Sequence, residues 1–441
     1  MFIFDTIVAE ATAPFESALS IVRLSGTKTN EILERLTEKS IDQFKPRMTY
    51  NRNIYTVDHK KIDNAVIVYF EKGKSFTGEE SAEFYVHGSR IIVNELIDTI
   101  ITLGARRAEG GEFTAKAYYN GRMSLVEAEA INEIIKAKTT KGKDLALKTL
   151  SGENREKIDN IRTELLDIMA RIEVDIDYPE YDDEEAIFEK LKIDLPIISQ
   201  KVKSLCADSK SALYYLTGIK VALVGRPNVG KSTILNSLLG YDKAIVTNIP
   251  GTTRDVVEGE KNINGVLYKF FDTAGIRDNP DPIEKIGIEK SHDTIKDADI
   301  ILYIYDKFDE EEYKDILIES NDKPVVKVQN KNDINSVDKE NDISISATSK
   351  KVNVIYEIIN KRLDIRETVE GGFASKRDLD LLDSFSKQLS EAVFNIEEGM
   401  TIDVIETMLL NSTHKLDELL GNNQTMEDLY STVFAKFCVG K

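Results

Sequence analysis

Five short motifs in the middle third of the chain could together bind and hydrolyse a nucleoside triphosphate. They are Gly225–Ser232 (GRPNVGKS), Gly251–Asp255 (GTTRD), Asp272–Gly275 (DTAG), Asn330–Asp333 (NKND) and Ser346–Thr348 (SAT). One such motif is weak evidence, but a glycine loop of this spacing after an apolar run is typical of a P-loop. The full ordered set predicts a GTP-binding domain.

The glycine loop supplies the phosphate chemistry. Gly225 and Gly230 allow backbone N–H groups to turn toward the phosphates, Lys231 offers a charge to the β- and γ-phosphates, and the Ser232 hydroxyl suits Mg²⁺. Thr253 is the expected switch ligand of Mg²⁺, and Asp272 is expected to reach the ion through water. The predicted GTP-binding residues are Asn228, Val229, Gly230, Lys231, Ser232, Thr233, Thr247, Asn248, Ile249, Pro250, Gly251, Thr252, Thr253, Asp272, Thr273, Ala274, Gly275, Asn330, Lys331, Asp333, Ser346, Ala347 and Thr348.

Two positions bear on specificity and catalysis. Asp333 can accept from both N1–H and the 2-amino group of guanine, which adenine cannot offer, so GTP is predicted over ATP. Ile276 stands where Ras-type GTPases carry a water-positioning glutamine, and an apolar side chain cannot orient water. The acid-rich segment 278–289 holds replacement candidates, and from the residues alone Glu284 is one acid among several, with a solvated helix face the more expected interpretation.

Composition limits the alternatives. The 441 residues carry a formal net charge of −19, which argues against a broad basic surface. Cys206 and Cys438 do not make a disulfide framework, which fits a reducing cytosol. The first residues lack the features of a secretory or transit signal, and no apolar run is long enough for a transmembrane helix.

Hydrophobic periodicity predicts a multidomain α+β and α/β fold. Strands are expected over 18–24, 65–70 and 83–87 and helices over 29–39 and 90–103, an α+β pattern. From 125 to about 215 the period is helical, with an acidic loop over 175–185 that is most simply a solvated surface. Strands at 220–224, 300–304 and 325–328 alternate with helices, as in a doubly wound, mainly parallel sheet. A further helical segment runs over 378–441.

The simplest organisation is a Ras-like P-loop domain inserted in a discontinuous all-helical domain. The predicted boundaries are 1–118 for the N-terminal α+β domain, 119–216 for the first helical part, 217–370 for the inserted G domain and 371–441 for the second helical part.

The G-domain motifs combined with the ending Cys438–Lys441 (CVGK) resemble the MnmE (TrmE) family of tRNA-modification GTPases. Further similarity lies in Asp5–Ala9, Ile21–Gly26, Ser75–Glu79 and His87–Gly88, and in Gly111–Thr114, Ala128–Ala130 and Asp175–Pro179. The resemblance implies a folate-binding-like N-terminal domain that dimerises and binds 5-formyl- or 5,10-methylene-tetrahydrofolate. With MnmG (GidA), a protein that uses FAD and NADH, such a GTPase installs an aminomethyl-type group on C5 of the wobble uridine of certain tRNAs. A homodimer in a larger complex with MnmG, in the cytoplasm, is therefore expected.

The resemblance also assigns residues. Arg23, Glu83, Arg122 and Lys441 would contact folate, because cations suit its glutamate tail and a carboxylate suits its pterin edge. Asn228, Thr247, Ile249 and Thr252 would hold K⁺, which can supply the charge of an arginine finger. Glu284 matches the residue that orients water, and Cys438 matches a cysteine near the modification centre.

Two other classes remain open. A GTP-switched RNA-binding or ribosome-assembly factor would share the G domain, but neither a Gly-x-x-Gly RNA loop nor a second P-loop is visible in the sequence. A membrane-remodelling GTPase would need a basic amphipathic helix with aromatic anchors, and the charge of −19 disfavours it. The sequence does not say which tRNAs are bound or whether glycine or ammonium is the co-substrate.

Overall fold

The computed structural model describes residues 4–177, 184–240, 259–272, 294–332, 341–346, 350–373, 375–422 and 425–440. The chain forms two compact units, each built from separated segments. Unit 1 contains Met1–Asn132, Leu150–Arg162 and Leu410–Lys441, and unit 2 contains Glu133–Thr149 and Thr163–Leu409. The predicted domain boundaries stay a prediction.

A six-stranded sheet in the order β3-β4-β5-β2-β1-β6 forms the centre of unit 1. Pairing is antiparallel except between β1 and β6, which run parallel. The strands span β1 Ile7–Glu10, β2 Ser17–Ser25, β3 Thr49–Tyr55, β4 Lys61–Phe70, β5 Ser81–Gly88 and β6 Arg106–Arg107. The strands predicted at 18–24, 65–70 and 83–87 are thereby confirmed.

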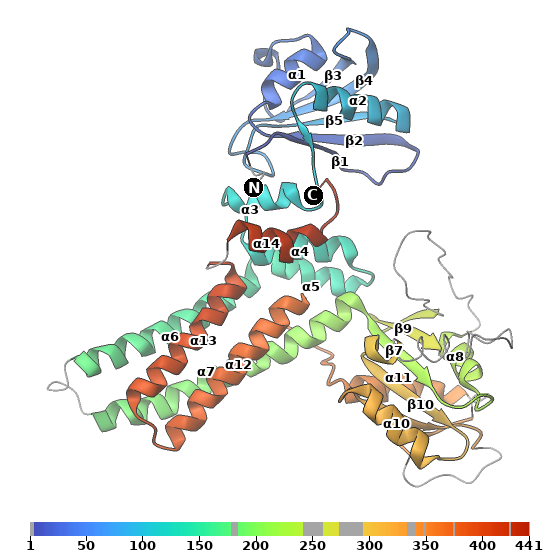
Figure 1. Ribbon diagram of the computed structural model, residues 1–441, viewed down its shortest axis with the longest axis vertical. Coiled ribbons are helices and arrows are strands. Elements are labelled where there is room, and N and C mark those ends of the chain that lie inside the picture. Colours follow the sequence, from blue (N-terminus) through green and yellow to red (C-terminus); the bar gives the residue numbers. More distant parts are fainter. Residues whose placement is uncertain are drawn as a thin grey trace. The chain divides into compact units, whose positions relative to one another are not determined.

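Helices α1 (Thr29–Thr37) and α2 (Arg90–Thr102) cover one face of this sheet (Figure 1). Their apolar residues bury against alternate residues of β2, β4 and β5, as the helical period requires. The predicted helix 29–39 ends two residues early. Glu38 adopts a left-handed conformation with φ 55°, which stops the helical hydrogen bonds at Thr37.

Short helices complete unit 1. A hydrophobic cluster joins α3 (Glu112–Tyr119) and the first turns of α4 (Leu125–Lys136) to α14 (Met426–Thr432) and the turn Phe434–Lys436. Leu429 and Phe434 are fully buried in that cluster. Segments from the two ends of the sequence therefore share one core.

Long helices dominate the middle of the chain. They span α5 Thr140–Leu150, α6 Glu153–Asp177, α7 Glu184–Thr217, α12 Lys376–Glu397 and α13 Ile402–Leu420. Helix α12 packs along α7 (Figure 1). Both ends of the loop predicted over 175–185 are helical instead, because α6 continues to Asp177 and α7 begins at Glu184. Residues 178–183 lie outside the described part of the chain.

A second six-stranded sheet lies in unit 2, in the order β12-β11-β10-β7-β9-β8. Only the β8–β9 hairpin is antiparallel among the described pairs. The strands span β7 Ile219–Val224, β8 Gly259–Ile263, β9 Val266–Asp272, β10 Ile300–Tyr305, β11 Val325–Gln329 and β12 Ile343–Ser344, and the helices span α8 Lys231–Leu239, α10 Glu310–Ser320 and α11 Val354–Arg362. The predicted doubly wound, mainly parallel sheet is confirmed. All six residues of β10 are buried, as expected for a central parallel strand.

Among the described residues, no helix is both long enough and apolar enough to cross a membrane.

Candidate functional site

The glycine loop of unit 2 connects β7 to α8, the context that a phosphate-binding loop requires. A Cβ atom on Gly225 would lie 2.0 Å from the Ile304 carbonyl oxygen, and one on Gly230 would lie 2.2 Å from Nδ2 of Asn330. Both glycines also have positive φ, 145° and 99°. Larger residues are therefore excluded at both ends of the loop, which leaves its backbone N–H groups free of covering side chains.

Lys231 is the first residue of α8 and is 5% exposed. Its ammonium donates to the carbonyl oxygens of Gly225 and Arg226, at 2.6 and 3.0 Å. The lysine thus lies across the loop, where its charge and the amino end of α8 both favour an anion.

The loop is tied to the segment that follows β11. The side chain of Asn330 donates to the Val229 carbonyl oxygen at 2.8 Å, and Nζ of Lys331 donates to the Asn228 carbonyl oxygen at 2.9 Å. Lys331 also pairs with Asp306. Partial burial by itself would raise the pKa of Asp306, but hydrogen bonds from Lys331 and from the backbone hold that pKa below its ordinary value. The predicted phosphate and guanine motifs therefore meet at the carboxyl edge of the sheet, where such folds bind ligands.

A second cluster of predicted residues lies in unit 1, around Arg23 on β2. Nε and Nη2 of Arg23 both lie 2.9 Å from Oε1 of Glu83 on β5, its register partner across the two strands. Nη1 donates to the Gly440 carbonyl oxygen at 3.0 Å. The guanidinium also lies over the rings of Phe76 and Phe113, 5.8 and 5.7 Å from their centroids. Arg23 therefore connects the sheet, the loop that contains Phe76, α3 and the last described residue of the chain.

The C-terminal tail, residues 437–440, runs beside the start of α3. Val439 forms an antiparallel bridge with Gly110, and the Gly111 amide donates to the Cys438 carbonyl oxygen at 3.3 Å. Cys438 is exposed and its thiol is free. Arg122 is also exposed, with its stem close to Gly78, where a Cβ atom would lie 3.2 Å from Cγ of Arg122.

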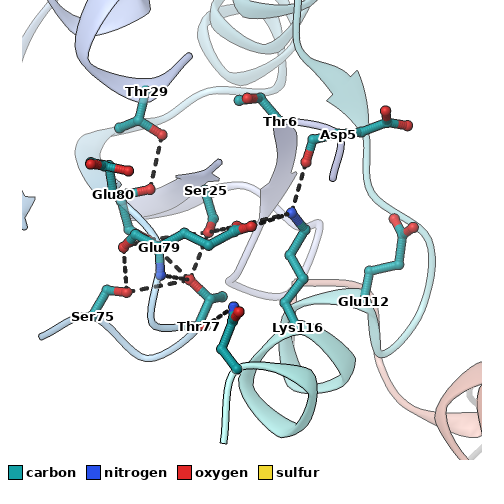
Figure 2. Close-up of polar contacts among 12 residues, drawn as sticks. Asp5, Thr6, Ser25, Thr29, Ser75, Thr77, Glu79, Glu80, Glu112 and Lys116 are labelled. Atoms are coloured by element: carbon teal, nitrogen blue, oxygen red, sulfur yellow. Dashed lines mark hydrogen bonds and ion pairs between the residues drawn. The ribbon is translucent and has the colours of Figure 1, made fainter. Parts of the chain in front are cut away.

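The loop that contains Phe76 is fixed by a buried polar network (Figure 2). Lys116 of α3 is 2% exposed and donates to both carboxylate oxygens of Glu79 and to the Asp5 carbonyl oxygen. Ser25 donates to Glu79 at 2.9 Å, and the Ser75 hydroxyl donates to the Glu79 carbonyl oxygen at 2.6 Å. The network joins β2, the loop and α3, so it fixes the two aromatic rings beside Arg23.

Comparison with known proteins shows the family of this chain. A family model described as the GTP-binding protein TrmE N-terminus matches residues 6–122, and one for the MnmE helical domain matches residues 125–438. A protein of Fervidobacterium nodosum named tRNA modification GTPase MnmE is 40% identical over 455 residues, covering 99% of this chain and 98% of its own. Its namesake in Clostridioides difficile is 38% identical over 463 residues and covers 100% of both. The chain belongs to the MnmE (TrmE) family of tRNA modification GTPases.

Among solved structures, one of Aquifex aeolicus Era is 29% identical and covers 38% of this chain and 65% of that chain, with a TM-score of 0.26. The predicted resemblance to the MnmE family is confirmed by the full-length relatives, not by this partial match.

Several residues predicted for this MnmE-family chain lie outside its described part. They are Thr247, Asn248, Ile249, Pro250, Gly251, Thr252, Thr253, Thr273, Ala274, Gly275, Glu284, Asp333, Ala347, Thr348 and Lys441. Asp272 is the last residue of β9, and its backbone pairs in register with Leu223 of β7. The end of β9 therefore lies beside the strand that leads into the glycine loop.

Sequence reasoning missed other residues of the cluster around Arg23 in this MnmE-family member. Tyr85 donates to Oε2 of Glu83 at 3.0 Å, and burial followed by the neighbouring Glu83 raises the pKa of Tyr85. The strand alternation could have found Tyr85, because residues two apart on β5 share a face with Glu83. Phe113 and Lys116 carried no such signal, since their role depends on where α3 packs.

Proposed function

We propose that this chain is a potassium-stimulated GTP hydrolase that works with an MnmG-type FAD protein. The pair would place an aminomethyl-type group on C5 of the wobble uridine (position 34) of certain tRNAs, with a tetrahydrofolate one-carbon donor. Membership of the MnmE family over the whole chain supports the tRNA-modifying part of this proposal. Action in the cytoplasm as a homodimer bound to MnmG belongs to the same proposal.

The main support for the proposal is that Arg23 on β2 bonds both to Glu83 on β5 and to the C-terminal tail. Arg23, Glu83 and Lys441 are predicted to contact one ligand, and Arg23 bonds to Glu83 and to Gly440, the residue before Lys441. A carboxylate fits the donor-rich edge of a pterin, while cations fit the glutamate carboxylates of a folate. Arg122 and Lys441 would supply the remaining cations, and Cys438 would lie near the modification centre.

The nucleotide half of the proposal depends on the glycine loop and its neighbours. The loop of unit 2 fits a triphosphate, because Gly225 and Gly230 leave no room for a Cβ atom and Lys231 supplies the charge. Ser232, Thr253 and Asp272 would hold Mg²⁺, and Asp333 would select guanine. Asn228, Thr247, Ile249 and Thr252 would hold K⁺, and Glu284 would orient the attacking water. The metal ions would supply positive charge to the transferring phosphoryl group.

The decisive experiment is mass spectrometry of wobble-uridine nucleosides in tRNA from cells that lack this protein. We expect loss of aminomethyl-type C5 modifications, with restoration by the full chain but not by a chain truncated before Cys438. An unchanged nucleoside profile would contradict the proposal. It would favour the alternative of a GTP-switched RNA-binding or ribosome-assembly factor, which ribosome profiles of the same cells would test.

A further inference from the structure

The C-terminal tail is fixed at its main chain while its cysteine side chain stays exposed. Phe437 is buried at 8% exposure, Val439 bridges to Gly110, and the backbone of Gly440 packs against β1. A Cβ atom on Gly440 would lie 2.6 Å from the Glu10 carbonyl oxygen, and the φ of 90° also requires glycine. The position of the Cys438 main chain therefore follows from contacts on both sides of it.

Arg23 donates a side-chain hydrogen bond to this tail. Its guanidinium has two acceptors, Oε1 of Glu83 and the Gly440 carbonyl oxygen. The other Glu83 oxygen, Oε2, accepts from Tyr85. Both oxygens of the carboxylate are thus already engaged, and Arg23 connects that carboxylate to the tail.

We propose that Arg23 is a positioning residue for the tail, so that a ligand bound at Glu83 changes how firmly Cys438 is held. The inference extends the proposed function, in which that ligand is a tetrahydrofolate. A heterocycle that offers two adjacent N–H donors uses both oxygens of Glu83, so it competes with Arg23 for Oε1. As the ligand weakens the contact of Arg23 with Oε1, the Gly440 carbonyl becomes the stronger acceptor of Arg23, and the tail is held more tightly.

The coupling must act in both directions. If ligand binding strengthens the contact between Arg23 and Gly440, then an intact tail strengthens ligand binding by the same factor. Loss of a hydrogen bond to a charged donor corresponds to about a tenfold change in an equilibrium constant, or more. The factor expected for each direction is of that size.

The first test needs no ligand. Hydrogen–deuterium exchange of peptides covering 435–441 is compared between the wild-type chain, Arg23→Gln and Arg47→Gln. Arg47 is the matched control, because it also donates to a backbone carbonyl, that of Lys74, but does not touch the tail. We expect exchange of the tail to be about tenfold faster in Arg23→Gln alone. Equal tail exchange in all three chains overturns the inference. If Arg23→Gln does not fold, Arg23→Lys replaces it, since a lysine cannot reproduce the planar bridge.

The second test adds 5-formyl-tetrahydrofolate, with its binding measured by calorimetry. We expect the ligand to slow exchange of the tail in the wild-type chain. In Arg23→Gln saturated with the ligand, exchange of the tail should stay unchanged, while the two chains should have equal thermal midpoints. Gly440→Ala, which displaces the tail, should weaken ligand binding by about tenfold more in the wild-type chain than in Arg23→Gln, because the coupling passes through Arg23. Binding without any change in tail exchange overturns the coupling. Absence of binding instead contradicts the folate part of the proposed function, and the ligand-free comparison then decides the role of Arg23.

Discussion

Lys116 places its ammonium nitrogen 3.0 and 2.9 Å from the two carboxylate oxygens of Glu79, beneath the loop that brings Phe76 to Arg23. The Lys116 side chain is 2% exposed and that of Glu79 is 17% exposed. Desolvation makes such a pair a weak source of net stability, but removing one partner leaves a buried charge without compensation. Because the pair joins α3 to the loop, its main effect is to set the spacing of the two rings beside Arg23.

Lys116→Met is therefore expected to destabilise unit 1 by about 3 kcal/mol or more, since it leaves the Glu79 carboxylate buried beside Ser25. The double variant Lys116→Met/Glu79→Gln removes both charges and should recover most of that loss. Urea denaturation of the single and double variants measures the difference. A double variant as unstable as the sum of both single variants would show that the two residues act independently.

Asn330→Ala should weaken binding of guanine nucleotides about 10- to 100-fold, because the buried Val229 carbonyl oxygen loses its donor and the glycine loop loses a tether. Titration with a fluorescent GDP analogue measures this change. Asn332→Ala is the matched control, since the contact of Asn332 to Ile345 uses only its backbone amide. Equal affinity in the wild-type chain and Asn330→Ala would refute the tether.

Glu133 predicts a pH dependence of stability. Burial raises the pKa of Glu133 from 4.5 to about 8, with a further contribution from Asp378, and its Oε2 has no hydrogen-bond partner. Between about pH 4.5 and 8 the unfolded chain ionises this group while the folded chain keeps it protonated. Ionisation therefore favours the unfolded state increasingly as pH rises through that window.

Glu133→Gln removes this effect. The variant should match the wild-type chain near pH 4.5 and become progressively more stable than it toward pH 8, by several degrees in the thermal midpoint. Thermal unfolding at a series of pH values measures the difference. A constant offset between the two chains across the window would show that the Glu133 carboxyl does not titrate differently on folding.

Glu284→Ala is expected to abolish GTP hydrolysis while GTP binding is kept, if Glu284 orients the attacking water. Single-turnover hydrolysis and nucleotide titration on the same preparation separate the two effects. Glu289→Ala, a second acid of the same segment, is the control and should hydrolyse GTP normally. Loss of binding in Glu284→Ala would show that the assigned role is wrong.

Asn228→Ala is expected to lose stimulation by K⁺ over Na⁺. Asn228 has a positive φ of 66°, so alanine adds backbone strain at this position. Asn228→Gly removes the amide without that strain and should lose the stimulation equally. Hydrolysis rates in the two salts measure the effect, and an unchanged preference in the glycine variant would exclude the Asn228 side chain as an ion ligand.

Local patterns were enough to predict much of this fold. The alternation in β4 and the buried run of β10 follow from side-chain period alone, and the glycine loop follows from its motif. The parallel pairing of β1 with β6 was not predictable, because β6 has two residues and no pattern. The contact of Arg23 with Gly440 joins residues 417 positions apart, so only the family resemblance suggested that these segments meet.

The composition of unit 1 from three separate chain segments has a consequence for folding kinetics. The cluster of α3 and α4 with α14 cannot form until the residues from Leu410 arrive, and more than half of the chain lies between these segments. Closing so long a loop is slow when the intervening chain is unfolded, whereas prior collapse of unit 2 shortens the effective loop. The order of events that this favours is sheet formation in the N-terminal segment, then unit 2, and last the docking of α14 and the tail.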